Sequence, residues 1–286
     1  MTQDTTHTAT DRAGMAQPEE TGREPAPAAP SRRISPETVD RITAIGSPMA
    51  LLVVWELVVR AGVLDVNFFP APSAILGRLV ELVKEGEVTE HTLISLRRLA
   101  LGFLVGAFPA LVLGLAMGLY RPIRAALDPL IAATYPIPKS AILPLLLLIF
   151  GLGEGSKIAM VAIGVFFPVV INTCAGVREI DKIYHDVGQN FGASRWHKFR
   201  SIALPGALPL IMTGLQLGIG LGLILIVLAE MIGGKDGLGY MIWNSWQLFQ
   251  VEDMYVGLIV ISVLGLVLSL ALKELERILI PWRRRS

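Results

Sequence analysis

The side chains best placed to do chemistry lie in one polar stretch, residues 186–205, between two strongly apolar segments. Residues 186–190 predict a short helix, and Gly192 interrupts the pattern. Residues 193–202 predict a second helix, which Pro205 is expected to end because proline supplies no backbone donor. A helix–glycine–helix unit between apolar segments predicts a hairpin at the water edge of a membrane bundle.

The side chains of this hairpin predict that it binds a soluble partner. Trp196 and Phe199 are three positions apart, so their rings share one helix face. Arg195 and its basic neighbours add positive charge to the same segment. Aromatic and arginine side chains are enriched among the residues that dominate protein–protein binding. We therefore expect a docking element here rather than a catalytic site.

Histidine and cysteine do not build a second chemical site in this sequence. The histidines are His7, His91, His185 and His197, and Cys174 is the single cysteine. One cysteine excludes a disulfide framework and a cysteine-based metal site. The sequence has no H-E-x-x-H zinc pattern, no G-x-S-x-G elbow and no G-x-x-x-x-G-K-[ST] phosphate loop. We expect a chain that is not an enzyme, holds no metal or cofactor of its own and does not hydrolyse ATP.

Composition places the chain in a lipid bilayer. Hydrophobic residues make up 53% of the sequence and charged residues 17%, while the formal net charge of +1 does not indicate nucleic-acid binding. A bilayer core needs about 20 apolar residues per helix. Segments of this kind are 42–61, 99–120, 129–152, 158–177, 208–229 and 254–272. The predicted fold class is an all-α integral membrane protein with six transmembrane helices.

Basic residues in short loops predict the orientation. They follow the second, fourth and sixth predicted spans, which places both termini and residues 178–205 in the cytoplasm. Residues 62–98 fit less well, because this outer segment holds several basic residues. These are Arg78, Lys84, Arg97 and Arg98. Residues 73–84 within it predict an amphipathic helix near the outer surface.

Four regions follow from these patterns. Residues 1–41 are rich in Thr, Pro, Ala, Glu and Asp and predict a disordered cytoplasmic tail. Residues 42–98 hold the first transmembrane helix and the outer amphipathic segment. Residues 99–275 form the main transmembrane domain, and residues 276–286 form a basic cytoplasmic tail.

Glycines recur at a spacing of four in two of the predicted spans. They are Gly102 and Gly106, Gly114 and Gly118, and then Gly214, Gly218 and Gly222. Such rows let helix backbones approach closely in lipid. The rows predict either seams that move or static packing, and the sequence leaves both open.

Prolines interrupt the third predicted span at Pro136, Pro138 and Pro144. A helix broken at membrane depth is tolerated where it is buried in protein or faces a water-filled path, so these residues are candidates for a translocation path. Lys139 lies at the break; it is either a functional charge within the membrane or a side chain that snorkels to the cytoplasmic interface. Glu230 is a further candidate for the path, although its place near a span end favours exposure at the interface.

The polar hairpin resembles the EAA loop of ABC-transporter permeases. The family pattern is E-A-A, three residues, G, nine residues, I, one residue, L-P. The corresponding positions are Asp186, Val187, Gly188, Gly192, Ile202, Leu204 and Pro205. All spacings agree, whereas the triplet reads Asp-Val-Gly, and Gly188 should weaken its helical turn by about 1 kcal/mol relative to alanine. With Ala193, Arg195, Trp196 and Phe199, these residues form the predicted ATPase-coupling loop.

Further passages resemble permeases of the nitrate, sulfonate, taurine and bicarbonate branch. They are residues 150–158, 136–139, 229–231 and 237–240, and the resemblance covers roughly residues 50–275. It implies the permease core of an ABC importer, a multi-pass protein of the bacterial inner membrane. The implied solute is a small oxyanion such as an alkanesulfonate, taurine or nitrate.

The resemblance also implies partners. These are a cytoplasmic ABC ATPase dimer that carries ATP and magnesium, a second permease copy and an extracytoplasmic solute-binding protein. Residues 233–252, with Trp243, Trp246 and Phe249, are candidates for contact with the binding protein. Two alternatives stay open, an importer of a heterocyclic vitamin precursor and an ion-coupled secondary transporter. The second would need internal repeats and several carboxylates within the spans.

Overall fold

The computed structural model describes residues 36–282, so residues 1–35 of the predicted tail lie outside the described part. The chain divides into two compact units, Met1–Met49 and Ala50–Ser286. The described part of the first unit, residues 36–49, is the beginning of helix α1 (Pro36–Arg60). Helix α1 thus begins ahead of the boundary predicted at residue 42.

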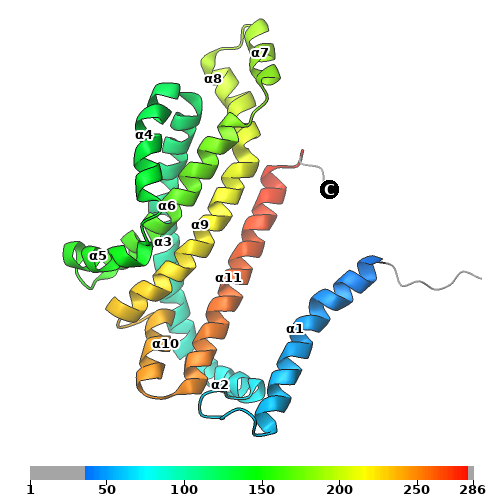
Figure 1. The fold of residues 1–286 in the computed structure, drawn as a ribbon, viewed down its shortest axis with the longest axis vertical. Helices are drawn as coiled ribbons and strands as arrows, with labels where there is room; N and C mark the ends of the chain where they lie inside the picture. The colour runs from blue at the N-terminus through cyan, green and yellow to red at the C-terminus, as the bar shows by residue number, and fades with distance from the viewer. Residues whose placement is uncertain (1–35, 283–286) are drawn as a thin grey trace, which may run out of the picture. The chain divides into compact units, whose positions relative to one another are not determined.

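Every element of the second unit is helical within the described residues, which confirms the all-α prediction (Figure 1). A 3₁₀ turn (Lys139–Ile142) leads into α5, and a π-turn (Phe199–Ala203) joins α8 to α9. The α-helices after α1 are α2 (Pro72–Glu85), α3 (Glu87–Leu119), α4 (Arg121–Thr134), α5 (Leu143–Phe150), α6 (Glu154–Arg178), α7 (Lys182–Asn190), α8 (Arg195–Lys198), α9 (Leu204–Gly233), α10 (Leu238–Gln247) and α11 (Val251–Leu279).

Helices α3, α6 and α9 form the core of the second unit. Buried Ala110, Val165 and Ile226, one from each helix, belong to its main apolar cluster. Figure 1 shows α6 and α9 side by side. A Cβ added to Gly106 would lie 2.4 Å from the carbonyl oxygen of Ala162, nearer than real Cβ atoms come. The glycine row of α3 therefore makes close backbone contact with α6 inside one chain.

The described helices confirm part of the predicted span count. Those long and apolar enough to cross a membrane are α3, α6, the continuous helix Arg195–Gly233 and α11. A fifth is obtained if Arg121–Thr134 and Lys139–Phe150 are one broken span, bent by 88°. The first predicted span falls in α1, which is not among these helices, so the count of six stays a prediction.

Helix α2 confirms the predicted amphipathic segment. Its buried Ile75 and Leu82 join a cluster with Val256 of α11. Arg78 donates from Nε to Asp253 Oδ1 at 2.6 Å, and this hydrogen bond raises the pKa of Arg78 above its ordinary value. Helix α2 is thereby tied to the first turn of α11, next to the loop that follows α10.

Candidate functional site

The first half of the polar hairpin is a capped helix closed by a glycine. The backbone N–H of Ile183 donates to Asp181 Oδ1 at 3.0 Å, so Asp181 caps α7, which begins before the predicted start at residue 186. Gly192 has φ +68°, in the left-handed region. Its N–H donates to Gln189, and the next N–H, of Ala193, reaches back to the carbonyl of Gly188 at 2.9 Å. These bonds define a Schellman motif, and the predicted turn at Gly192 is confirmed.

The departure from the family triplet at Gly188 has a packing reason. Gly188 is buried in the hairpin, and a Cβ added there would lie 2.9 Å from Ile202 Cδ1. Ile202 is the isoleucine of the same spaced pattern, so the two ends of the pattern contact one another. The missing methyl group of Gly188 leaves room for the Ile202 side chain.

The second half of the hairpin runs directly into a membrane helix. Ser194 caps α8 by accepting a hydrogen bond from the N–H of His197 at 3.2 Å. Arg195–Gly233 forms one helix of 39 residues, so the prediction that Pro205 ends the second helix is wrong. Just before the proline, the N–H of Leu204 donates to the carbonyl oxygen of Phe199, five positions back, which forms a π-turn. Pro205 then lies in the first turn of α9, where a residue without an N–H donor is tolerated.

The outer face of the hairpin is apolar and aromatic. Trp196 is 67% exposed and stacks on Phe199 with ring centroids 5.5 Å apart. Phe191 is 86% exposed, and Val187, four residues earlier, is also exposed. Arg195 and Trp196 also line a groove that extends to the end of α3 at Tyr120. Large exposed apolar side chains outside the predicted spans indicate a protein-binding surface.

Lys139 satisfies the carbonyl groups that the proline break sets free. Its Nζ donates to the carbonyl oxygens of Thr134, Tyr135 and Ile137 at 3.1, 2.9 and 2.9 Å. Nζ also lies 4.1 Å from the ring centroid of Phe167, a cation–π contact. An ammonium group has three donors, so all of them are used within the chain. This geometry favours a role in closing the end of α4.

The structure separates the residues predicted for the translocation path. Pro136 and Pro138 flank the break with Lys139, and Pro144 lies in the first turn of α5. Glu230 is 0% exposed, so the prediction that it faces the interface is wrong. Its hydrogen bonds go to residues of α3 and to Gly239 rather than to the break. Whether these residues line one path stays a prediction.

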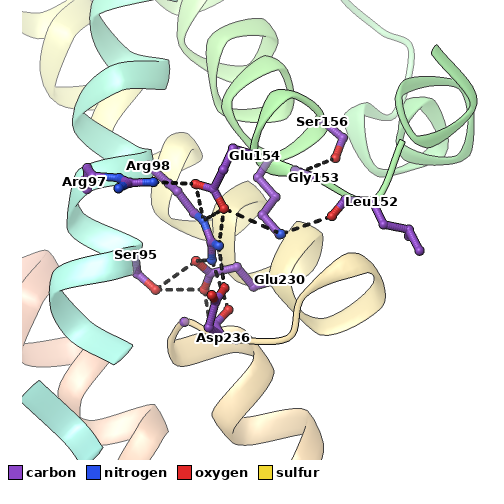
Figure 2. A network of polar contacts seen from close by, with 12 residues as sticks. Ser95, Arg97, Arg98, Leu152, Gly153, Glu154, Ser156, Glu230 and Asp236 are labelled. Carbon is purple, nitrogen blue, oxygen red and sulfur yellow. Dashed lines mark hydrogen bonds and ion pairs between the residues drawn. The ribbon is translucent and has the colours of Figure 1, made fainter. Parts of the chain in front are cut away.

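Glu230 belongs to a cluster of charges centred on Arg98, whose buried members are Arg98, Glu230 and Lys157 (Figure 2). Arg98 is 1% exposed, and its Nη1 lies 2.9 Å from Glu230 Oε1 and 3.0 Å from the carbonyl oxygen of Asp236. Its Nε donates to Glu154 at 3.0 Å, and Nη2 contacts the carboxylates of Glu154 and Asp236. Ser95 donates to Glu230 Oε2 at 2.8 Å.

The cluster is balanced in charge. Three cations face three carboxylates: Arg97, Arg98 and Lys157 against Glu154, Glu230 and Asp236. Burial of an unpaired charge is costly, and mutual pairing offsets this cost. The basic residues that fitted poorly in the outer segment, Arg97 and Arg98, are therefore neutralised by partners distant in sequence. That misfit, and the family-like passages around Glu154 and Glu230, were sequence signals of the cluster.

Comparisons with known proteins identify relatives over most of the chain. A family model described as "Binding-protein-dependent transport system inner membrane component" matches residues 110–285. The chain is 35% identical, over 82% of its length and 86% of the relative, to a protein of Bacillus subtilis (strain 168) named as an aliphatic sulfonates transport permease, SsuC. It is 34% identical, over 84% of its length and 89% of the relative, to the taurine transport system permease protein TauC of Escherichia coli (strain K12).

A solved structure shows the same fold. It is the crystal structure of an amino acid ABC transporter with histidines, which matches with a TM-score of 0.54 and 17% identity. The match covers 71% of this chain and 97% of that chain. At this identity the likeness concerns the fold alone.

Proposed function

The chain belongs to the family of binding-protein-dependent transport system inner membrane components, and from this membership we propose that it is the permease subunit of an ATP-driven importer. The family consists of membrane transport proteins rather than enzymes, and the chain has several helices that can cross a membrane. The observation that carries the finer proposal is the hairpin of α7 and α8. It is capped at both helix starts, closed by a left-handed glycine, and aromatic on its exposed face.

The hairpin supports a mechanical link to an ATPase. At about 1.5 Å per residue, the 39-residue helix that leaves the hairpin is about 58 Å long. Figure 1 shows α8 at one end of α9 and α10 beyond the other end. A displacement of the hairpin by a closing ATPase would be carried along this helix. Two global states that the ATPase binds differently are the thermodynamic requirement for such coupling.

We propose the partners from the family membership. A cytoplasmic ABC ATPase dimer would supply ATP and magnesium, each ATPase subunit receiving one hairpin. A second copy of the chain would complete the pore, and an extracytoplasmic binding protein would deliver the solute. The basic loops favour cytoplasmic termini, because lysine and arginine are retained on that side.

For the solute we propose a small oxyanion, with alkanesulfonates and taurine ahead of nitrate. The support is the names of the two similar permeases, one for aliphatic sulfonates and one for taurine. Lys139 is a poor anion ligand in this conformation, because its three donors already bind carbonyl groups. We therefore assign solute selection to the binding protein rather than to this lysine.

Uptake by proteoliposomes tests the proposal. The chain, the ATPase and the binding protein are reconstituted together, and radiolabelled taurine, a longer alkanesulfonate, nitrate and a pyrimidine vitamin precursor are compared. The proposal requires sulfonate uptake that depends on both ATP and the binding protein. Uptake driven by an ion gradient without ATP would overturn the mechanism, and uptake of the pyrimidine alone would overturn the solute class.

A further inference from the structure

One face of α3 holds the turn that joins α9 to α10. His91, Ser95 and Arg98 are spaced four and three residues apart, so they lie on one side of the helix. Each of them binds the turn at residues 236–239 through a different polar group. Figure 2 shows two of them, Ser95 and Arg98, directed from α3 toward Glu230 and Asp236.

The hydrogen bonds follow the turn residue by residue. The guanidinium group of Arg98 donates to both the carbonyl oxygen and the carboxylate of Asp236. The N–H of Gly237 donates to His91 Nδ1 at 3.1 Å, and the N–H of Leu238 donates to Ser95 Oγ at 2.8 Å. The next N–H, of Gly239, donates to Glu230 Oε2 at 3.0 Å. Four successive residues thus have their backbone polar groups held by side chains.

The turn is also fitted sterically to this cluster. Gly237 has φ +98°, a conformation that L-residues rarely adopt. A Cβ added there would lie 2.3 Å from the Cδ of Glu230. The carboxylate that accepts the N–H of Gly239 therefore lies directly against the Gly237 backbone. A different path of the turn would break several of these contacts together.

A cluster that only neutralised Arg98 would not need this pattern. Carboxylates alone would pair the guanidinium, whereas here contacts from α3 reach three N–H or C=O groups of the turn itself. Buried backbone groups must find partners, and these side chains supply them. Because Leu238 is the first residue of α10, the contacts set the direction in which α10 leaves the turn.

Helix α10 in turn presents an aromatic surface. Its inner face is fixed by Met241, which is buried against α2 and α11 in the cluster of Ile75 and Val256. Trp246 is exposed near its end, and Phe249 is 85% exposed in the following turn. Phe249 has φ +56° and is the only non-glycine residue with positive φ among the described residues. An exposed aromatic ring held in an unfavourable backbone conformation is typical of a functional surface.

We propose that His91, Ser95 and Arg98 form a clamp that positions the 236–239 turn and thereby orients α10 and its aromatic end. In the proposed importer this surface faces the binding protein, and only that identification of the partner rests on the proposed function. The three side chains are positioning residues that act through the turn.

Cysteine labelling tests the clamp locally. The reporter is Met241→Cys in a Cys174→Ser background, because Met241 lies on α10, is 2% exposed and is not part of the clamp. Its rate of reaction with N-ethylmaleimide is measured on the assembled complex in nanodiscs. Adding Arg98→Met should accelerate labelling about tenfold or more, since it removes the cation that pairs with buried Glu230 and the donors that hold Asp236. Arg98→Lys should recover part of the protection, because it keeps the charge but not the fork.

The neighbouring arginine provides the matched control. Arg97 also contacts Glu154, at 3.0 Å, but its side chain is 66% exposed, so Arg97→Met should change the labelling rate less than about twofold. Native Cys174, buried in α6, is the second reporter, in the chain that keeps Met241. A clamp predicts faster labelling at position 241 with an unchanged rate at Cys174. Equal acceleration at both positions would mean general destabilisation and would overturn the proposal.

Two further variants cover a failure of Arg98→Met to fold. Arg98→Met with Glu230→Gln removes one charge of each sign and keeps an acceptor for Gly239. Ser95→Ala leaves every charge in place and removes the acceptor for the Leu238 N–H together with the hydroxyl group that donates to Glu230. Both should expose position 241, and protection as in the parent in both would refute the clamp. Retention of the ATPase is scored on the same preparations, so a failure of the proposed function is seen separately.

Discussion

The conformation of Gly192 allows a prediction that separates backbone strain from surface contact. Gly192 closes α7 with φ +68°, and no described atom lies within 4 Å of the position that a Cβ would take. A substitution there meets no obstacle inside the chain, so its effect comes from the backbone. Placing an L-residue other than asparagine in this region costs about 1–2 kcal/mol.

This energy sets the size of the expected effect. Since 1.4 kcal/mol is a factor of ten, the equilibrium constant for forming the turn should fall by about 5- to 30-fold in Gly192→Ala. The apparent affinity for the ATPase should fall by up to the same factor, because only the formed hairpin binds. Gly192→Val should be worse, since its β-branched side chain is still less tolerant of positive φ.

The assay is a titration of the fluorescently labelled ATPase subunit onto the permease in nanodiscs. Gly192→Asn is the matched control, because asparagine adopts the left-handed conformation readily but adds a side chain of similar size to valine. It should bind within about threefold of the parent. Equal binding by all variants would refute the strain argument. Equal weakening by asparagine and valine would show that any side chain at this position blocks the partner.

Other predictions follow from single contacts. Gly106→Ala should destabilise the chain by about 3 kcal/mol or more, because the added methyl group meets the backbone of Ala162. Gly220→Ala, where a methyl group meets no other atom, should be neutral or slightly stabilising. Thermal unfolding of both variants in detergent measures the difference. Lys139→Met should lower stability by about 1–3 kcal/mol, because the carbonyl groups of Tyr135 and Ile137 lose their donor. The half-saturating solute concentration for uptake should stay unchanged, and a raised value would point instead to an anion site. Phe249→Gly should raise the unfolding temperature by relieving about 1 kcal/mol of backbone strain. It should also weaken the stimulation of ATPase activity by the binding protein, and unaltered stimulation would exclude Phe249 from the docking surface.

The hairpin was predictable because its signals are local. Caps, a helix-closing glycine and aromatic spacing all act within a few residues, and the turn at Gly192 is confirmed. The end of the second helix was not predictable from Pro205. A π-turn differs from an α-helical turn in which carbonyl group accepts the hydrogen bond of a given N–H. The composition of residues 199–203 does not distinguish the two kinds of turn.

The charge cluster lay beyond local patterns for a different reason. Glu230 and Arg98 are 132 residues apart in sequence, so a window around either one shows its charge near the end of an apolar run but not the partner that pairs with it. From such a window, exposure at the interface is the natural expectation. Burial became possible only because three helices bring the opposite charges together.

Site-specific photo-crosslinking tests the central claim most directly. A photoreactive phenylalanine derivative is placed at Trp196 in the hairpin, or at Trp246 in α10, which is also exposed. The tagged chain is irradiated in its native membrane and its adducts are identified by mass spectrometry. The account predicts that position 196 captures an ATPase subunit and that position 246 does not. No ATPase adduct at position 196, with the intact ATPase present in the membrane, would contradict the assignment of the hairpin as the coupling element.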